Sequence, residues 1–283
     1  MSNTYRINFK ELRQENLKDI FAAFERALQQ LDIDFYLIGA LARDTWFAQK
    51  GIRALGTKDI DFAVMVSDPE KFDALKKYMI SKEGFTESST NEYVLFDRKG
   101  NQIDLLPFGS IEIEGKKIVD KQGMTRTDIS GFKEVYEEAI EEVSFEGKYR
   151  FNVSTLAGIV ILKFISYDDR PEMRSQDIKD IGAILKNYFE LETETIYEHH
   201  TDLFQEEEND LTKIAARVLG RQMQSVSNRN ELLKERLLSI LNQNTLSVDE
   251  SRIGFLLQDE SPADVEYQVD LLKEIIAGIN DTV

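Results

Sequence analysis

Two aspartates interrupt an otherwise apolar run, TKDIDFAVMV at residues 57–66. The composition of 59–66 predicts a β-strand, and strand residues two apart point to the same face. Asp59 and Asp61 would then lie side by side, while Ile60 and Phe62 face the core. Two carboxylates this close repel, and partial burial raises the cost. The strand therefore needs a wet face, a lysine or backbone N–H cap on each carboxylate, or a cation.

The composition restricts which cation could serve. The chain has 283 residues, no cysteine and two histidines, the adjacent His199 and His200. This excludes a disulfide scaffold and a thiolate metal site and gives no basis for an imidazole-rich site. Any metal would bind through oxygen, which favours Mg²⁺, Mn²⁺ or Ca²⁺. The formal net charge of -17 argues against broad nucleic-acid binding. It leaves room for a local basic patch or for a nucleotide carried with its cation.

The sequence also predicts a cytoplasmic protein with no membrane partner. It contains no apolar run long enough to span a bilayer. Residues 1–20 lack the cationic-then-apolar order of a signal peptide. The absence of cysteine is typical of a reducing compartment.

Residues up to about 120 mix strands and helices. Gly39 ends a first strand, and the helix after it closes at Gly51; Ser67 or Asp68 caps a second helix that has Pro69 in its first turn. An earlier helix is predicted from the spacing of apolar residues between 12 and 31. The predicted strands are 35–39, 59–66, 92–97 and 102–108, with a further hairpin in 110–119 around Glu114–Gly115.

From about residue 150 the pattern becomes helical. Apolar residues recur at steps of three and four in five segments, 154–169, 175–190, 211–224, 230–241 and 263–278. We therefore predict an α+β fold in which residues 1–150 form a core with a mixed β-sheet flanked by helices. Residues 151–283 would form an α-helical domain that follows it.

Three further features bear on the paired aspartates. The strand, Gly39 turn and helix present unpaired N–H groups and a positive dipole end to an anion. Asp104 lies amid apolar residues of a second predicted strand, so three carboxylates converge if the two strands are neighbours. Lys163 interrupts an apolar helix, with Arg170 seven residues on along the same face. Lys163 either snorkels to solvent or meets a phosphate as a point charge.

A basic stripe lies on the helix predicted at 211–224. Its members are Lys213, Arg217 and Arg221. The stripe is either an ordinary solvated face or a site that guides an acceptor, such as RNA, toward a metal centre.

In this order, the motifs resemble the polymerase-β nucleotidyltransferase superfamily. Within it the sequence is similar to the AbiEii/AbiGii abortive-infection toxin group and its solitary bacterial relatives. The matching segments are IGALARD (38–44), GTKDIDFAVMV (56–66), GF (84–85), IDLLPFG (103–109), STLAGIVILKFISYDDR (154–170) and QDIKDI (176–181). Together they cover roughly residues 30–190, and their order is more specific than any single motif.

The resemblance implies a role for each matching residue. Asp59, Asp61 and Asp104 would bind Mg²⁺ or Mn²⁺, and Asp104 would help to activate the attacking hydroxyl. Gly39 and the backbone of Ala40 would hold the nucleoside triphosphate. The remaining matches are Lys163 and either Asp177 or Asp180, which would line the nucleotide site. Arg170 matches the arginine of the family's DR motif, and Arg43 with Asp44 match its ARD motif; both arginines would bind the nucleotide.

The implied reaction transfers a nucleoside monophosphate from an NTP, such as ATP, to an acceptor hydroxyl, with the active site in a cleft that the helical domain completes. The acceptor would be tRNA if the protein acts as a toxin, in which case a cognate antitoxin is expected. A small hydroxyl compound is the alternative acceptor. Two departures, Ala40 and Gln176, keep open a catalytically silent member that binds a nucleotide or a partner.

Overall fold

The computed structural model describes residues 5–12, 16–57, 59–109, 117–119, 126–204, 209–258 and 264–282. The chain forms two compact units. The first comprises Met1–Tyr136 and Ile140–Thr155, and the second comprises Glu137–Ala139 and Leu156–Val283. Within the described ranges, no helix combines the length and the apolarity needed to cross a membrane.

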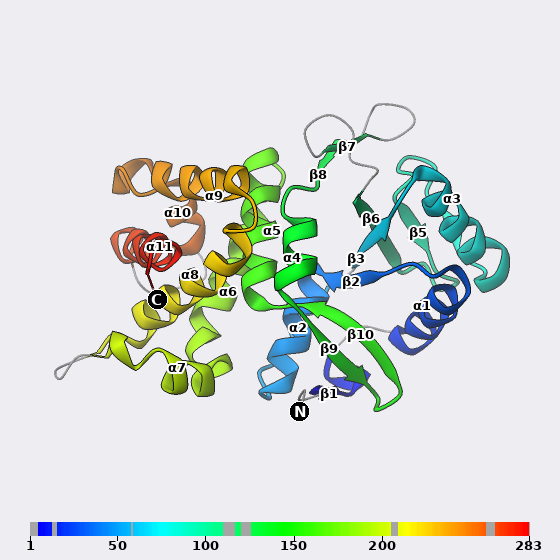
Figure 1. Cartoon of the computed structure of the whole chain (residues 1–283), viewed down its shortest axis with the longest axis horizontal. Helices are drawn as coiled ribbons and strands as arrows, with labels where there is room; N and C mark the ends of the chain where they lie inside the picture. Colours follow the sequence, from blue (N-terminus) through cyan, green and yellow to red (C-terminus); the bar gives the residue numbers. More distant parts are fainter. Residues whose placement is uncertain are drawn as a thin grey trace. The chain divides into compact units, whose positions relative to one another are not determined.

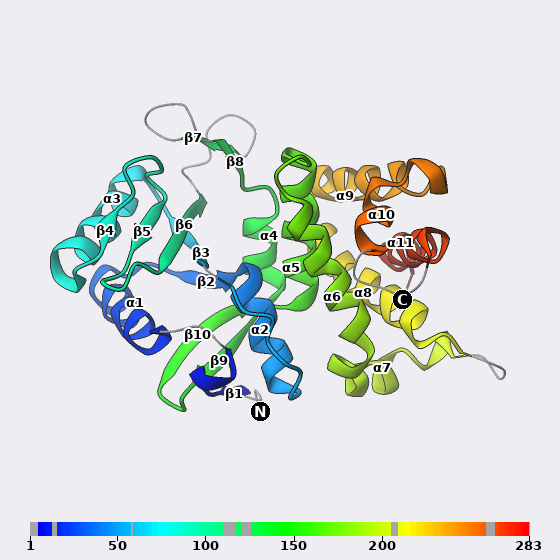
Figure 2. The same ribbon diagram turned by 180° about the vertical axis from the view of Figure 1, so that it is seen from behind.

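The first unit is built on an eight-stranded mixed sheet (Figures 1 and 2). In spatial order its strands are β1 (Tyr5–Ile7), β9 (Ile140–Phe145), β10 (Tyr149–Ser154), β2 (Phe35–Ile38), β3 (Asp59–Val66), β6 (Gln102–Gly109), β5 (Val94–Phe96) and β4 (Thr86–Glu87). Strand β3 runs antiparallel to β2 and parallel to β6. The short strands β7 (Lys117–Val119) and β8 (Arg126–Asp128) pair separately.

Helices accompany this sheet. They are η1 (Phe9–Leu12), α1 (Leu17–Leu31), α2 (Gly39–Gln49), α3 (Pro69–Tyr78), η2 (Met79–Glu83) and α4 (Phe132–Glu138). Asp68 caps α3 by accepting a hydrogen bond of 2.8 Å from the Lys71 N–H group. The predicted α+β class, with a mixed sheet flanked by helices and a helical region after it, is confirmed.

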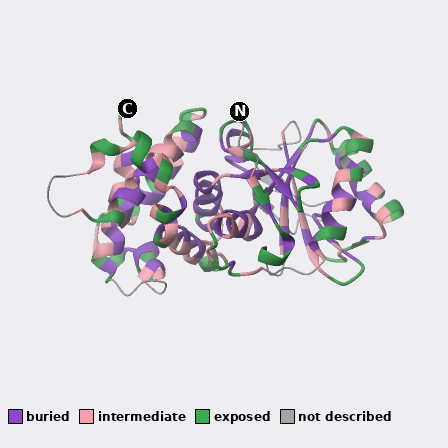
Figure 3. Cartoon of the chain, turned by 90° about the horizontal axis from the view of Figure 1, so that it is seen from below, coloured by how far each residue is buried: buried purple, intermediate pink, exposed green. Residues whose placement is uncertain are grey.

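The two faces of the sheet differ in what covers them. On one face, Phe62 of β3 stacks on Phe24 of α1, with ring centroids 4.2 Å apart. On the other, the Tyr36 hydroxyl of β2 donates to the Phe132 carbonyl of α4. Ile60 and Phe62 are both 0 % exposed, so the prediction that they face the core is confirmed. Figure 3 shows buried residues along the strands of this sheet.

Most predicted elements occur, but one hairpin was missed. Strands β9 and β10 pair antiparallel, and β10 adds parallel to β2, so this hairpin extends the sheet by two strands. Its signal is present in YRFNVS (149–154), where apolar and polar residues alternate after the Glu146–Gly147 turn. The hairpin predicted around Glu114–Gly115 lies outside the described residues for 110–116, and β7 pairs with β8.

The second unit is helical. Its elements are α5 (Leu156–Asp169), α6 (Ser175–Leu191), α7 (Thr193–His199), η3 (Thr201–Leu203), α8 (Leu211–Ser227), α9 (Glu231–Gln243), η4 (Val248–Glu250), α10 (Arg252–Gln258) and α11 (Val265–Ile279). Helix α5 is buried over most of its length, as its apolar sequence predicts.

Helices α8 and α11 approach each other closely through two glycines. A Cβ atom on Gly220 would lie 2.3 Å from the Ile275 carbonyl oxygen. A Cβ on Gly278 would lie 2.2 Å from the Arg217 carbonyl oxygen. Because both neighbouring atoms belong to backbone, neither helix can make room by a side-chain rotation.

We therefore expect Gly220→Ala to destabilise the second unit, by about 1–3 kcal/mol as typical overpacking does. Chemical denaturation followed by circular dichroism measures the effect. Ser225→Ala, on the exposed side of α8, is the matched control and should unfold like the wild type. Wild-type stability for Gly220→Ala would contradict the close approach.

Candidate active site

Three carboxylates converge on the face of the sheet against which α4 packs. Asp61 of β3 is the register partner of Asp104 of β6, and Asp59 lies two residues before Asp61 on the same face. One oxygen of each of the three side chains lies within 4.8 Å of the others. All three side chains are half-buried. The predicted convergence of Asp59, Asp61 and Asp104 is thus confirmed, because β3 and β6 are neighbouring parallel strands.

Gly39 lies directly against this cluster. It begins α2, where its φ of 68° is in the left-handed region. A Cβ atom at this position would lie 2.2 Å from Asp61 Oδ2. Ile38, the residue before it, is the register partner of Asp61 across β2 and β3. The Asp61 carboxylate therefore sits at the N-terminal end of α2, where the helix dipole favours negative charge.

Two neutral side chains donate hydrogen bonds to two of the three carboxylates, and neither was predicted from the sequence. The Thr57 hydroxyl donates to Asp59 Oδ1 at 2.6 Å. The Gln102 amide donates to Asp104 Oδ1 at 2.8 Å. Each donor precedes its carboxylate by two residues, and this spacing is the signal that could have identified it.

Arg43 and Asp44 form a buried ion pair behind the turn. The Arg43 side chain is 2 % exposed and donates to Asp44 Oδ1 through Nε and Nη2. Asp44 Oδ2 accepts the Gly56 N–H group at 2.8 Å. The pair thus anchors the loop that leads to Thr57. Nucleotide binding by Arg43 stays a prediction, and its burial does not favour it.

Lys163 lies in the helical unit, between two aspartates of α6. Its ammonium is 2.9 Å from Asp177 Oδ1 and 2.6 Å from Asp180 Oδ2. Burial lowers the pKa of Lys163, but attraction by Asp177 and Asp180 outweighs it, and the net pKa is raised. One ammonium and two carboxylates leave a net charge of -1, which does not favour a triphosphate at this point. The predicted contact of this cluster with a nucleotide stays a prediction.

One further predicted nucleotide contact, Arg170, belongs to the same unit. Arg170 Nε is 3.3 Å from Asp169 Oδ2, and the Arg170 side chain is 29 % exposed. Gln176, the departure noted in the sequence, donates its amide to Asp180 Oδ1 at 3.2 Å. Gln176 therefore joins the Lys163 cluster as a neutral partner. Arg170 Nε is buried and has no hydrogen-bond partner within the described part of the chain. Phosphate binding by Arg170 stays a prediction.

The basic stripe on α8 is neutralised by acids. Lys213 pairs with Asp270, and Arg217 and Arg221 both pair with Asp281. Three partners complete the set: Glu274 on Arg217, and Asp202 and His200 Nδ1 on Arg221. Burial and the Arg221 charge lower the pKa of His200. Four carboxylates thus pair with three cations, so the interpretation of the stripe as a site that guides RNA is not favoured.

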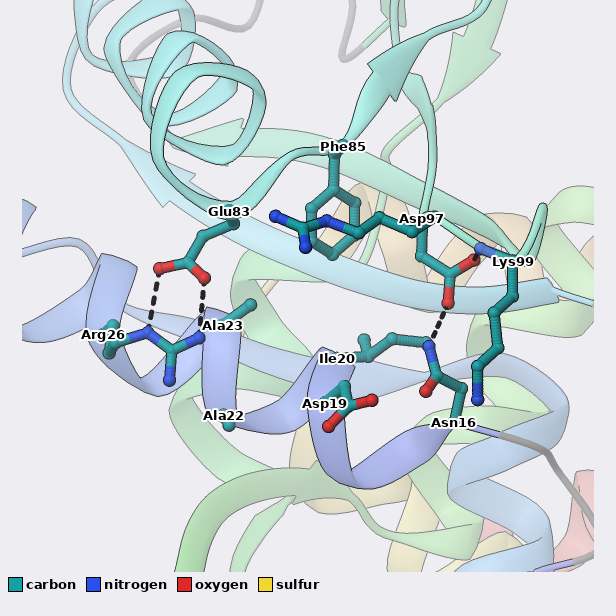
Figure 4. Close-up of a pocket in the computed structure, with 11 residues that line it drawn as sticks. Asn16, Asp19, Ile20, Ala22, Ala23, Arg26, Glu83, Phe85, Asp97 and Lys99 are labelled. Carbon is teal, nitrogen blue, oxygen red and sulfur yellow. Dashed lines mark hydrogen bonds and ion pairs between the residues drawn. The ribbon is translucent and has the colours of Figure 1, made fainter.

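A hollow of about 330 Å³ lies elsewhere in the first unit, between α1 and the β5–β6 turn (Figure 4). Three of its charged groups, those of Arg26, Glu83 and Asp97, have partners within the protein. Arg26 forms a two-bond pair with Glu83, and Asp97 accepts from the Asn16 amide at 2.5 Å. Among its described lining residues, no buried polar atom lacks a hydrogen-bond partner. The buried polar atoms of these lining residues are therefore satisfied within the protein.

The aspartate cluster fits a hard divalent cation. Mg²⁺ and Mn²⁺ prefer oxygen ligands, and carboxylates from two neighbouring strands supply them. Thr57 and Gln102 are neutral donors, so they orient the carboxylates without cancelling charge. The donor set therefore matches the metal that the sequence predicted.

No family model and no curated protein matches the chain. Among solved structures it is similar to the antibiotic-resistance factor ANT(2″)-Ia, with 12% identity and a TM-score of 0.34; the match covers 67% of this chain and all of that one. It is also similar to a CCA-adding enzyme in apo form I, with 15% identity and a TM-score of 0.34; the match covers 88% of this chain and 51% of that one. For the CCA-adding enzyme in complex with CTP, the identity is 13% and the TM-score is 0.34; the match covers 94% of this chain and 70% of that one. These neighbours are nucleotidyltransferases.

The Gly39–Asp61 contact can be tested by its coupling. We expect Gly39→Ala to lower the free energy of unfolding through the strained φ, by about 1–2 kcal/mol, and through the clash with Asp61. In an Asp61→Ala background the clash partner is gone, so the cost of Gly39→Ala should fall by about 0.5–3 kcal/mol. Equal costs in the two backgrounds, measured by urea denaturation, would show that Gly39 and Asp61 do not touch.

The α8 network gives a pH dependence. Hydrogen bonds from Arg217 and Arg221 outweigh burial and lower the pKa of Asp281 from 3.8 to about 2. A lowered folded-state pKa contributes stability above the unfolded value, and this contribution is lost as pH falls from about 4 to about 2. We expect Asp281→Asn to destabilise the protein at neutral pH by about 1–3 kcal/mol. The difference from wild type should shrink across that acid range.

Thermal unfolding at a series of pH values measures this difference. Asp249→Asn, at an exposed position of η4, is the control and should leave the melting temperature unchanged. A deficit for Asp281→Asn that stays constant down to the lowest pH would contradict the assignment.

Proposed function

We propose that the protein is a nucleotidyltransferase that binds Mg²⁺ (or Mn²⁺) and an NTP at Asp59, Asp61 and Asp104. It would transfer a nucleoside monophosphate to an acceptor hydroxyl and release pyrophosphate. The observation that carries this proposal is the convergence of three half-buried carboxylates within 4.8 Å on two parallel strands. Such a cluster is costly to fold unless a cation compensates it.

A divalent ion bound there would stabilise the charge that develops on the phosphate oxygens in the transition state. The chain itself would do the rest. The N-terminal end of α2, at Gly39 and Ala40, suits a phosphate oxyanion because its backbone N–H groups point outward along the helix axis. Asp104 would accept the proton of the attacking hydroxyl, as a general base must. Ala40 lacks a hydroxyl but keeps its N–H group, so this role survives the departure.

A small hydroxyl compound suits the role of acceptor better than RNA does. The net charge is -17, and each cation of the α8 stripe is paired with a carboxylate. RNA affinity depends on cations that are available to phosphates. A cationic small molecule, by contrast, gains from an acidic surface. Membership of the AbiEii/AbiGii-like toxin group, with tRNA as acceptor and an antitoxin partner in the cytoplasm, is the competing form of the proposal.

The test is incubation with each α-labelled NTP and Mg²⁺, with a panel of small hydroxyl compounds in one arm and total tRNA in the other. We expect label transfer to a small compound in the wild type. Asp59→Asn, Asp61→Asn and Asp104→Asn should each lower it by at least about a hundredfold, because each removes a charged ligand of the metal.

Asp73→Asn, on α3 and away from the cluster, is the control and should transfer at the wild-type rate. Label on tRNA would favour the toxin-like form. A wild-type protein that binds the NTP with Mg²⁺ but transfers label to no acceptor would favour the catalytically silent alternative. No binding and no transfer would remove the proposal.

A further inference from the structure

We infer that Thr57 and Gln102 are positioning residues, which hold the Asp59 and Asp104 carboxylates in the orientation that a divalent cation requires. The inference rests on the proposed metal site and goes beyond it, because it assigns the metal affinity partly to two neutral side chains. Neither residue needs to touch the cation. Their effect would reach it through the carboxylates that they hold.

Thr57 holds Asp59 by two contacts. The Thr57 hydroxyl donates to Asp59 Oδ1 at 2.6 Å, and the Thr57 hydroxyl oxygen accepts from the Asp59 backbone N–H at 3.4 Å. The hydroxyl thus fixes the side chain relative to its own backbone. Asp59 is at the first position of β3, and Thr57 lies in the loop before this strand, so the restraint on Asp59 comes from the loop.

That loop is itself anchored. Asp44, which is 0 % exposed and paired with Arg43, accepts the Gly56 N–H group next to Thr57. Asp44 belongs to α2, the helix whose first residue lies against Asp61. One helix therefore sets the position of two carboxylates: Asp61 by direct contact at Gly39, and Asp59 through Gly56 and Thr57.

Gln102 holds Asp104 from the neighbouring strand. It precedes Asp104 by two residues on β6, so both side chains lie on one face. It is also the register partner of Asp59. Its amide therefore lies in the row beside Asp59 and donates to Asp104 Oδ1 at 2.8 Å. A neutral donor at this point adds no charge to a face that already carries three carboxylates.

Bringing three carboxylates together costs free energy because like charges repel. Without restraint, mutual repulsion drives them apart, and a cation must pull them back into position when it binds. A donor that fixes a carboxylate removes part of that reorganisation and its entropy. Outer residues of this kind typically change metal affinity by about 10–100-fold. Each donor also occupies only part of one carboxylate, which has about four lone-pair sites in all.

The experiment is a titration of the purified full chain with Mn²⁺ alone, followed by the electron paramagnetic resonance signal of the free ion. Thr57→Val removes the hydroxyl at constant shape, and Gln102→Met removes the amide at similar length. We expect each to raise the Kd for Mn²⁺ about tenfold or more. Thr57→Ser keeps the hydroxyl and should bind within about twofold of wild type.

Stability of the metal-free protein separates positioning from folding. The melting temperatures of Thr57→Val and Gln102→Met without metal should stay within about 2 °C of wild type. Thr86→Val, exposed on β4 and separated from β6 by β5, is the control for the loss of a threonine hydroxyl. It should alter neither quantity.

The outcomes distinguish this inference from the proposed function. Wild-type Mn²⁺ affinity in both Thr57→Val and Gln102→Met, with a lower affinity in Asp61→Asn, would overturn the positioning role and leave the metal site standing. A loss of affinity that Thr57→Ser shares, together with a lowered melting temperature, would assign Thr57 a folding role instead. A wild-type protein that binds no Mn²⁺ would overturn both proposals.

Discussion

The parallel pairing of β3 with β6 is the constraint on which the first unit depends. It places Asp61 opposite Asp104, and the strand period then puts Asp59 and Gln102 in the adjoining row on the same face. A shift of the register by one residue would turn the carboxylates toward the aromatic layer of Phe24, Phe35 and Phe62. The packing of α1 against this sheet therefore determines which way the aspartates point.

Around that pairing, one helix joins the fold to the site. The first residue of α2 is a glycine because an Asp61 oxygen occupies the space where a Cβ would lie. Further along the same helix, buried Asp44 holds the loop that leads to Thr57. Both ends of this arrangement therefore act on the aspartate cluster: Gly39 contacts Asp61, and Asp44 holds the loop before Asp59. The buried Arg43–Asp44 pair thus has a structural role.

Local sequence patterns predicted most of the individual strands and helices. They did not predict contacts between residues that are far apart in the chain. The strand at 59–66 follows from its apolar composition, and β3 has those bounds. Which strand lies beside it does not follow, since Asp61 and Asp104 are brought together by register alone. The α8 stripe illustrates the same limit. Its cations were visible in the sequence, whereas the Asp281 carboxylate that pairs with two of them lies some sixty residues away.

Whether the three aspartates form a metal site is tested most directly by crystals soaked in Mn²⁺ and measured for anomalous scattering. The account predicts an anomalous peak about 2.0–2.6 Å from an oxygen of each of Asp59, Asp61 and Asp104, and no such peak in Asp61→Asn crystals. Carboxylates that stay within 4.8 Å of one another with no peak between them, at saturating Mn²⁺, would contradict it.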